Sequence, residues 1–343
     1  MSLRSLLYLA CIVVASPALA EEASYPYEVI VPTGRNAQEL REAQPPEVAG
    51  TGFGARLDRW HDKLYMGVQN FIERTDQRFA DNELELLSVP ASPFRIGSET
   101  EFVDTGHRLD FNGRLSVDFL LQLPNIEQRL RLFVTSDDVQ ESPNQFGRSD
   151  NSLRAGLRYS TLRYFDFDVG LRADFPDAAF ASLRWQRVYQ AGGWDVQPFA
   201  KVYVQTGDGI GVASGVTFDH WKNRWLVRSA SYANWFRNEA ATSWTQTIVV
   251  AKAREIIRFG RFGPIVRGRD ISRGMGVQLL ATGERTSKVD EYELSLFSKH
   301  ATRKRWLYWY VAPLVRWERD NDWKTEPGIR VGIDALFWDL SDR

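Results

Sequence analysis

The sequence predicts an all-β protein: a transmembrane, antiparallel, up-and-down β-barrel of 14 strands preceded by one amphipathic helix, with 12 strands as the alternative. Three observations predict this fold. From residue 94 onward the hydrophobic pattern repeats every two residues, the alternating segments are long, and aromatic residues make up 13% of a chain with negative mean hydropathy. This combination is typical of strands that face lipid on one side and polar groups on the other.

The alternation is clearest over residues 109–123. Apolar side chains occupy the odd positions except Gly113, and most even positions are polar or charged, as at Asp110, Arg114 and Asp118. A soluble sandwich also alternates, but its strands are typically about five or six residues long, whereas these segments run to between 10 and 16 residues. A strand that crosses a bilayer needs about 9 to 11 residues, and its backbone groups must all be paired, so such strands close into a barrel.

Fourteen segments are expected to form the barrel. They are residues 94–104, 108–123, 127–137, 151–162, 165–175, 178–190, 194–206, 210–221, 225–238, 243–257, 271–284, 290–301, 305–318 and 327–338. An even count places both ends of the barrel on one side of the membrane, where turns are short. The Arg- and Gly-rich connection 258–270 would lie on that side and is longer than expected.

The last strand carries a resemblance to a known class. Residues 328–337 alternate and end in Phe337, six residues before the end of the sequence. This strand resembles the C-terminal signature of bacterial outer-membrane β-barrels, which the barrel assembly machinery reads. More loosely, the helix, the hairpin 121–132 and the strand 305–318 resemble functionally uncharacterised proteobacterial outer-membrane proteins. The resemblance implies a location in the outer membrane of a Gram-negative bacterium, in contact with its lipid and lipopolysaccharide.

Residues 1–20 are expected to form a signal peptide. Arg4 precedes an apolar run, and Ala18 and Ala20 form the small-residue pattern that signal peptidase accepts, so cleavage is expected near Ala20. The only cysteine, Cys11, lies within this segment. The expected domains are therefore the signal peptide, a periplasmic segment at 21–93, and the barrel at 94–343.

Within the periplasmic segment, residues 55–80 have helical periodicity. Apolar residues recur at steps of three and four and are expected to form a contact face: Leu57, Trp60, Leu64, Val68, Phe71, Ile72 and Phe79. Three placements remain open for this helix. It occupies part of the bore, lies on the inner leaflet, or docks a periplasmic protein partner.

The polar phase of the strands is expected to face the bore. It places there Asp110, Arg114, Asp118, Arg129, Arg131, Arg154, Arg158, Asp166, Asp168, Arg172, Asp174, Arg184, Lys201, Arg228, Lys252, Arg254, Arg316, Glu318, Arg330 and Asp334. Charges of both signs therefore meet inside. They predict either a water-filled pore in which arginines favour anions or an ion-pair network that stiffens a nearly filled barrel.

Little in the sequence indicates chemistry. The formal net charge is −1 without a basic cluster, so nucleic acid is not an expected partner. Of the four histidines, His61 is expected to be solvent-exposed on the polar side of the helix. His107, near Asp104 and Thr105, is expected to be an ordinary histidine of the outer rim or a loop, with a general base as the less favoured alternative. No catalytic residue, metal site or cofactor is assigned.

Three hypotheses about function follow. The first is a narrow passive channel for small polar or anionic solutes. The second is a non-conducting scaffold or assembly component that docks a periplasmic partner through its N-terminal helix. The third, a lipid-modifying hydrolase at the rim, is the only enzyme among them, and the first two are favoured over it.

Overall fold

The computed structural model describes most of the predicted barrel and helix. The described residues are 52–79, 94–122, 130–135, 153–162, 164–173, 179–207, 209–237, 242–258, 269–284, 288–304 and 306–337. The expected signal peptide and most of the following lead lie outside the described residues, as do most of the 258–270 connection and the chain after Phe337.

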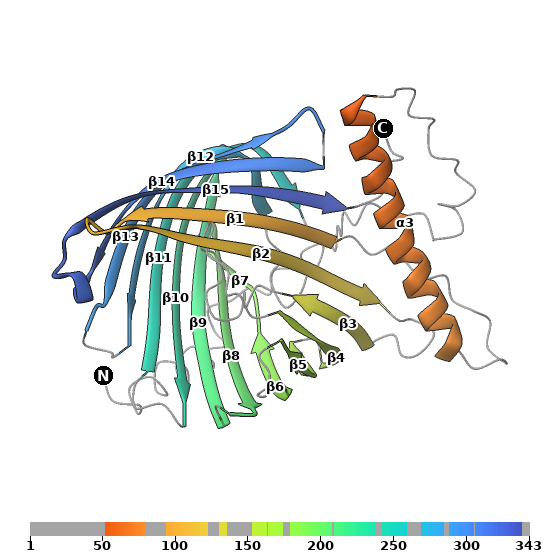
Figure 1. Ribbon diagram of the computed structural model, residues 1–343. Coiled ribbons are helices and arrows are strands. Elements are labelled where there is room, and N and C mark those ends of the chain that lie inside the picture. Colours follow the sequence, from red (N-terminus) through yellow and green to blue (C-terminus); the bar gives the residue numbers. More distant parts are fainter. Residues whose placement is uncertain are drawn as a thin grey trace.

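One helix and fifteen strand segments are described, with a 3-10 turn between the last two strands (Figure 1). The helix is α3 (Phe53–Phe79), and the turn is η2 (Arg319–Asn321). The strands are β1 (Phe94–Asp104), β2 (Leu109–Gln122), β3 (Leu130–Thr135), β4 (Arg154–Leu162), β5 (Phe165–Arg172), β6 (Ala179–Gln186), β7 (Tyr189–Ala191), β8 (Trp194–Gln205), β9 (Gly209–Lys222), β10 (Trp225–Phe236), β11 (Thr242–Arg258), β12 (Arg269–Gly283), β13 (Glu291–Ala301), β14 (Leu307–Glu318) and β15 (Thr325–Phe337).

The strands form a closed antiparallel barrel of fourteen, which confirms the predicted fold. Sequential neighbours pair throughout, β1 pairs with β15, and β6 and β7 both pair with β8 as two parts of one interrupted strand. The interruption lies opposite Pro198. The amide of Arg187 donates to the carbonyl of Pro198, but proline has no N–H to return the bond, so the ladder weakens there.

Both ends of the barrel lie at one edge. The first residue of β1, Phe94, is the register partner of the last residue of β15, Phe337. Two tight turns join strands at this same edge. Gly192 and Gly193 connect β7 to β8 and Asn223 and Arg224 connect β9 to β10, all with positive φ, as two-residue hairpin turns of the mirror-image types require.

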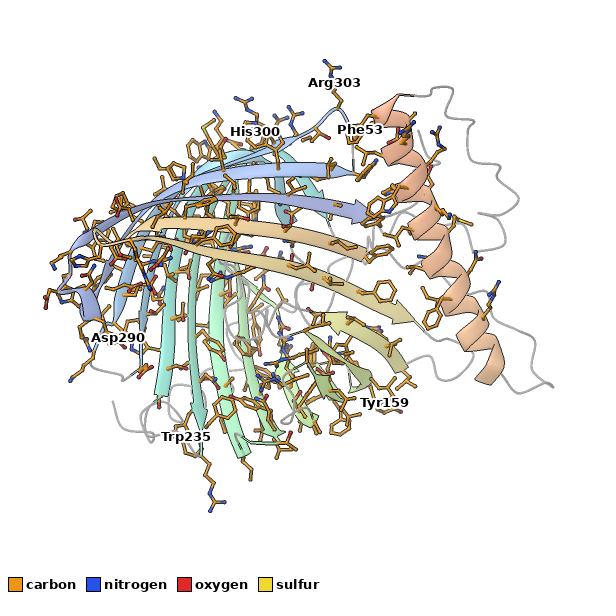
Figure 2. All side chains as sticks on the ribbon, viewed as in Figure 1. Phe53, Tyr159, Trp235, Asp290, His300 and Arg303 are labelled. Carbon is orange, nitrogen blue, oxygen red and sulfur yellow. The ribbon has the colours of Figure 1, made fainter. Side chains whose placement is uncertain are left out.

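The barrel wall separates apolar from polar side chains. On β9, Ile210, Val212 and Phe218 are exposed on the outer face, whereas Ala213 and Asp219 are buried on the inner face. Outward apolar residues of the same kind lie on β2, β4, β5, β6, β8, β11, β12, β13 and β15 and form an outer belt. Side chains project from both faces of the wall (Figure 2).

Helix α3 packs against the outside of the barrel, across the edge that holds both barrel ends (Figure 1). Tyr65 packs with Phe94 and Phe337, and Ile72 packs with Phe119 and Leu132. These strand residues are on the outward phase of β1, β15, β2 and β3, so the described helix lies outside the bore.

Candidate functional site: the charged interior

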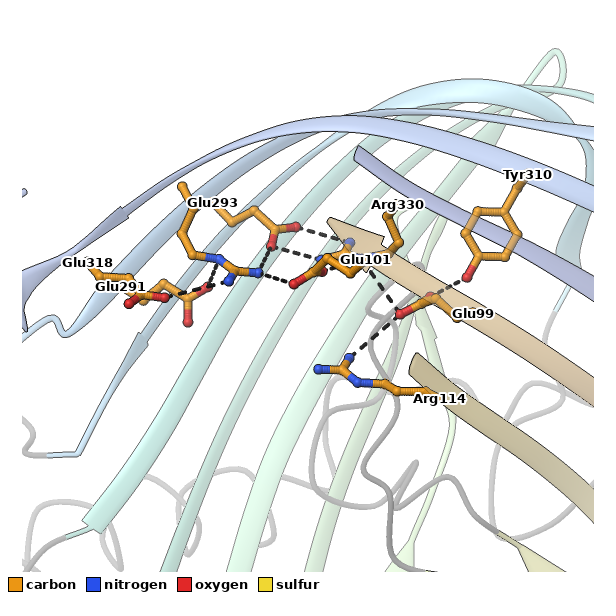
Figure 3. Close-up of polar contacts among 9 residues, drawn as sticks. Glu99, Glu101, Arg114, Glu291, Glu293, Tyr310, Glu318 and Arg330 are labelled. Carbon is orange, nitrogen blue, oxygen red and sulfur yellow. Dashed lines mark hydrogen bonds and ion pairs between the residues drawn. The ribbon is translucent and has the colours of Figure 1, made fainter. Parts of the chain in front are cut away.

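A network of ion pairs lines the inner face of β13, β14, β15, β1 and β2. At its centre, Arg330 is fully buried, with Nε 2.8 Å from Glu101 Oε2 and Nη2 2.9 Å from Glu293 Oε2. Arg316 donates through Nη2 to Glu101 Oε1 at 2.7 Å, and its Nε lies 3.2 Å from Glu291 Oε1. The arginines of β14 and β15 thus hold the carboxylates of β1 and β13 together (Figure 3).

The network continues to Glu99. Arg114 Nη1 lies 3.6 Å from Glu99 Oε1, and Tyr310 donates its hydroxyl hydrogen to Glu99 Oε2. The ring of Tyr310 lies over Gly332 on β15, where any Cβ would collide with it. Glycine at position 332 therefore allows Tyr310 to lie flat and reach Glu99.

We call the inner face of β13, β14, β15, β1 and β2 the paired wall. The strand register there places opposite charges directly across from each other. Glu101 is the direct partner of Arg330, Glu293 of Arg316, and Glu99 of Arg114. Buried carboxylates and guanidinium groups are tolerated when each charge is paired and hydrogen-bonded. The arrangement fixes the relative positions of five neighbouring strands.

The inner face of β3 to β6, with Lys201 on β8, has the opposite character, and we call it the basic wall. The register places like charges directly opposite each other in three pairs: Arg131 with Arg158, Arg154 with Arg172, and Arg184 with Lys201. Like charges in direct cross-strand positions are destabilising. Four of the six residues are nevertheless buried, and the register also gives two of them a carboxylate as a direct partner, Asp168 opposite Arg158 and Asp166 opposite Arg184.

Aromatic rings and two acids accompany these cations. Arg158 makes a bidentate pair with Asp168, both distances being 2.6 Å. The guanidinium groups of Arg158, Arg154 and Arg184 lie over the rings of Phe133, Phe180 and Phe199, and Lys201 lies over Tyr203. On the inner faces of β3 to β6 plus Lys201, six basic residues accompany two acidic ones, Asp166 and Asp168.

The structure places the predicted bore-facing residues that it describes on the inward phase, except Lys252 and Arg254. Arg129 and Asp174 lie outside the described residues. Lys252 and Arg254 are exposed on the outward phase of β11, which alternates with buried Val249, Ala251 and Ala253. From Val249 to Ala253 the inner face of β11 is apolar, so the polar phase there faces outward. Lys252 lies over the ring of Trp225.

Among the inward residues, Asp110 is at the rim, 2.5 Å from Arg108. Arg228 makes a bidentate pair with Asp219.

The sequence reading did not single out Glu99, Glu101, Glu291, Glu293 or Tyr310. On β13 the signal was present, because Glu291 and Glu293 alternate with Tyr292 and Leu294. On β1 it was weak, because Ser98 and Thr100 interrupt the apolar phase.

The predicted helix face divides into two groups. Leu64, Val68 and Ile72 pack against the barrel. Trp60 and Phe71 are 51% and 59% exposed, although Trp60 touches the edge of Phe337. Leu57 is partly exposed, and the side chain of Phe79 is outside the described part of the chain.

The structure changes the interpretation of one histidine. The expectation of an exposed His61 is wrong: it is 1% exposed, stacked between Trp306 and Phe337, with Nε2 donating to the carbonyl of Leu336 at 3.2 Å. His107 is exposed in the β1–β2 turn. His300 lies 2.8 Å from the hydroxyl of Ser298 and stacks on Trp309.

Two searches of the described residues bear on other kinds of site. No helix there has the length and apolar composition needed to cross a bilayer. Within the same ranges, no group of three or more His, Cys, Asp or Glu side chains is arranged to hold a metal ion.

The comparisons with known proteins concern overall shape. No protein-family model matches the chain, and no curated protein matches it. An anion-selective porin from Comamonas acidovorans is 8% identical, with a TM-score of 0.40 over 73% of this chain and 99% of that chain. OprB of Pseudomonas putida is 9% identical, with a TM-score of 0.44 over 72% and 93%. A loop-deletion mutant of OmpT from Vibrio cholerae is 10% identical, with a TM-score of 0.40 over 71% and 98%. Similarities this low assign no activity to this chain.

Proposed function

We propose that this chain is an outer-membrane β-barrel that forms a narrow passage for small polar or anionic solutes along its basic wall. The apolar outer belt supports insertion in a bilayer, because such a surface would be costly to expose to water over most of a barrel. A location in the outer membrane fits the closed antiparallel barrel with both barrel ends at one edge.

The three like-charge pairs of the basic wall carry the proposal. A row of closely spaced cations lowers the energy of an anion inside a medium of low dielectric constant. The paired wall offers an anion no net attraction, since its four glutamates, Glu99, Glu101, Glu291 and Glu293, outnumber its three arginines. An anion therefore has a preferred path along one side of the bore.

A non-conducting scaffold is the second candidate, and one observation favours it. Many inward side chains around the ring are almost entirely buried, including Arg158 at 1%, Arg184 at 2% and Lys201 at 3%. A wide aqueous pore would leave its wall exposed. In this reading the ion-pair network is a rigid filling, and function depends on a partner.

Conductance in planar bilayers distinguishes these candidates. We expect the refolded barrel to give small, discrete current steps with a reversal potential that favours anions. The double variant Arg184→Gln, Lys201→Gln should shift the reversal potential toward zero. Arg108→Gln, at the exposed rim, is the matched control and should leave it unchanged. If the wild-type barrel is folded, as its heat-modifiable migration would show, and inserted in the bilayer but gives no current, the channel is refuted and the scaffold is supported.

A further inference from the structure

Helix α3 has more apolar surface than its contact with the barrel uses. Its barrel-facing side is a mixed stripe of buried residues at steps of three and four: Ala55, Asp58, His61, Tyr65, Gln69 and Ile72. Asp58 anchors this stripe through Lys304 and through Trp306 Nε1, 3.1 Å away. The contact with the barrel leaves the large apolar side chains of Phe53, Trp60 and Phe71 mostly exposed, although Trp60 touches the edge of Phe337.

Those side chains belong to a second, largely exposed stripe, which borders the barrel contact at Trp60 and Leu64. Phe53 is 78% exposed, Trp60 51% and Phe71 59%, with the partly exposed Leu57 and Leu64 between them. Steps of three and four along a helix place these five residues on one side. Phe53 marks the N-terminal end of this stripe in Figure 2.

A third side of the helix is basic. Arg56, Arg59, Lys63 and Arg74 are exposed, and their spacing places them together, beside the apolar stripe. Helices that lie in a membrane interface combine such an apolar face, with Trp, Phe and Leu, and a polar face rich in Lys and Arg.

The position of α3 on the barrel indicates which surroundings contact its apolar stripe and its basic side. It covers Phe94, Phe119 and Phe337, which belong to the same outward phase as the exposed belt residues Leu115 and Ile333. The apolar stripe is thus a continuation of the lipid-facing belt at the edge that holds both barrel ends.

We propose that α3 lies in the headgroup region of the periplasmic leaflet, with Trp60 and Phe71 among the acyl chains and Arg56, Arg59 and Lys63 bound to anionic phospholipid. This inference rests on the proposed outer-membrane location. It commits to a lipid surface, because the apolar stripe continues the belt and the basic side complements anionic headgroups.

Site-directed spin labelling tests the depth of the helix. Cysteines are introduced singly into a Cys11→Ser background at Phe71, Lys63, Leu296 in the middle of the β13 belt, and Asp322 in the β14–β15 turn. In vesicles of phosphatidylethanolamine and phosphatidylglycerol, we expect Phe71 to be as accessible to oxygen as Leu296. Lys63 should lie between Leu296 and Asp322 in accessibility to a polar nickel chelate.

The controls separate the two proposals. A Leu296 label in water would overturn the membrane location itself. A lipid-exposed Leu296 together with a Phe71 label as accessible to the chelate as Asp322 would overturn only the interfacial helix.

Lipid retention tests the anionic preference. Purified barrel should retain phosphatidylglycerol over phosphatidylethanolamine in native mass spectrometry, and each basic residue removed should weaken this preference about fivefold. The variant is Arg56→Gln, Arg59→Gln, Lys63→Gln. Its control is Arg108→Gln, Lys324→Gln, which removes exposed cations at the opposite edge. Equal loss in both variants, or no loss in the first, would refute a specific headgroup contact.

Discussion

The imidazole of His61 lies parallel to the ring of Phe337, with centroids 4.8 Å apart and an angle of 7° between the planes. Phe337 in turn stacks on Phe94, at 4.4 Å and 6°. The helix, the last strand and the first strand are therefore joined by one aromatic stack. His61 also bonds the carbonyl of Leu336, so it contributes both a ring and a hydrogen bond to the attachment of α3.

Replacing His61 with alanine should detach the helix without opening the barrel. The variant loses two ring contacts and one hydrogen bond to the barrel, together about 2 to 4 kcal/mol, besides a bond to Asp62 within the helix. We expect trypsin to cleave faster after Arg59 and Lys63, while the barrel keeps its heat-modifiable migration on gels. Phe53→Ala removes an aromatic group from the exposed side of the same helix and should leave the cleavage rate in detergent unchanged.

Asp58 and Lys304 should be energetically coupled. The carboxylate of Asp58 accepts hydrogen bonds from Lys304 and from Trp306, so Asp58→Leu loses both and Lys304→Met loses one. A double-mutant cycle of α3 proteolytic protection should give a coupling energy of about 1 to 2 kcal/mol. Additive effects of the two substitutions would show that the ion pair does not hold the helix.

Arg330→Met should strongly destabilise the barrel. It leaves the carboxylates of Glu101 and Glu293 buried without their main partner, a change that typically costs about 3 to 5 kcal/mol. Urea unfolding in detergent measures the loss. Adding Glu101→Gln and Glu293→Gln to the Arg330→Met variant should recover much of the lost unfolding free energy. The cost comes from burying the two carboxylates without Arg330, and the substitutions remove those charges. Failure of this rescue would mean that packing, and not charge, is the role of Arg330.

Gly332→Ala should displace Tyr310 and break its hydrogen bond to Glu99. The added methyl group has no room beneath the tyrosine ring, and we expect a loss of about 1 to 3 kcal/mol in unfolding free energy. Gly113→Ala is the matched control, since the nearest heavy atom to its Cβ would be 3.6 Å away, on Phe111. Similar losses at both sites would indicate a general effect of removing strand glycines.

The barrel could be predicted from the sequence because alternation determines which side of a strand faces lipid. Residues 109–123 illustrate this, and the described β2 spans Leu109–Gln122. The interruption opposite Pro198 was not predicted, because it depends on which residue of β8 meets Arg187 across the sheet.

The attachment of the helix was beyond sequence reasoning for a different reason. Hydrophobicity predicts that Trp60 and Phe71 face protein, but in a membrane the surrounding medium is also apolar. The barrel-facing side includes Asp58, His61 and Gln69. The burial of Asp58 and His61 depends on specific partners far away in the chain, Trp306 and the carbonyl of Leu336. Likewise, the like-charge pairs of the basic wall appear only once the strand register is known.

The position of α3 has a consequence for how the barrel opens. β1 and β15 are the first and last strands of the closed sheet, and the helix that precedes β1 in the chain also packs on the end of β15. Lateral separation of these two strands would break the aromatic stack of His61, Phe337 and Phe94 in addition to the backbone hydrogen bonds between the strands. Helix α3 therefore stabilises the closure between β1 and β15. Lateral release of β1 from β15 should be among the slowest motions of the molecule.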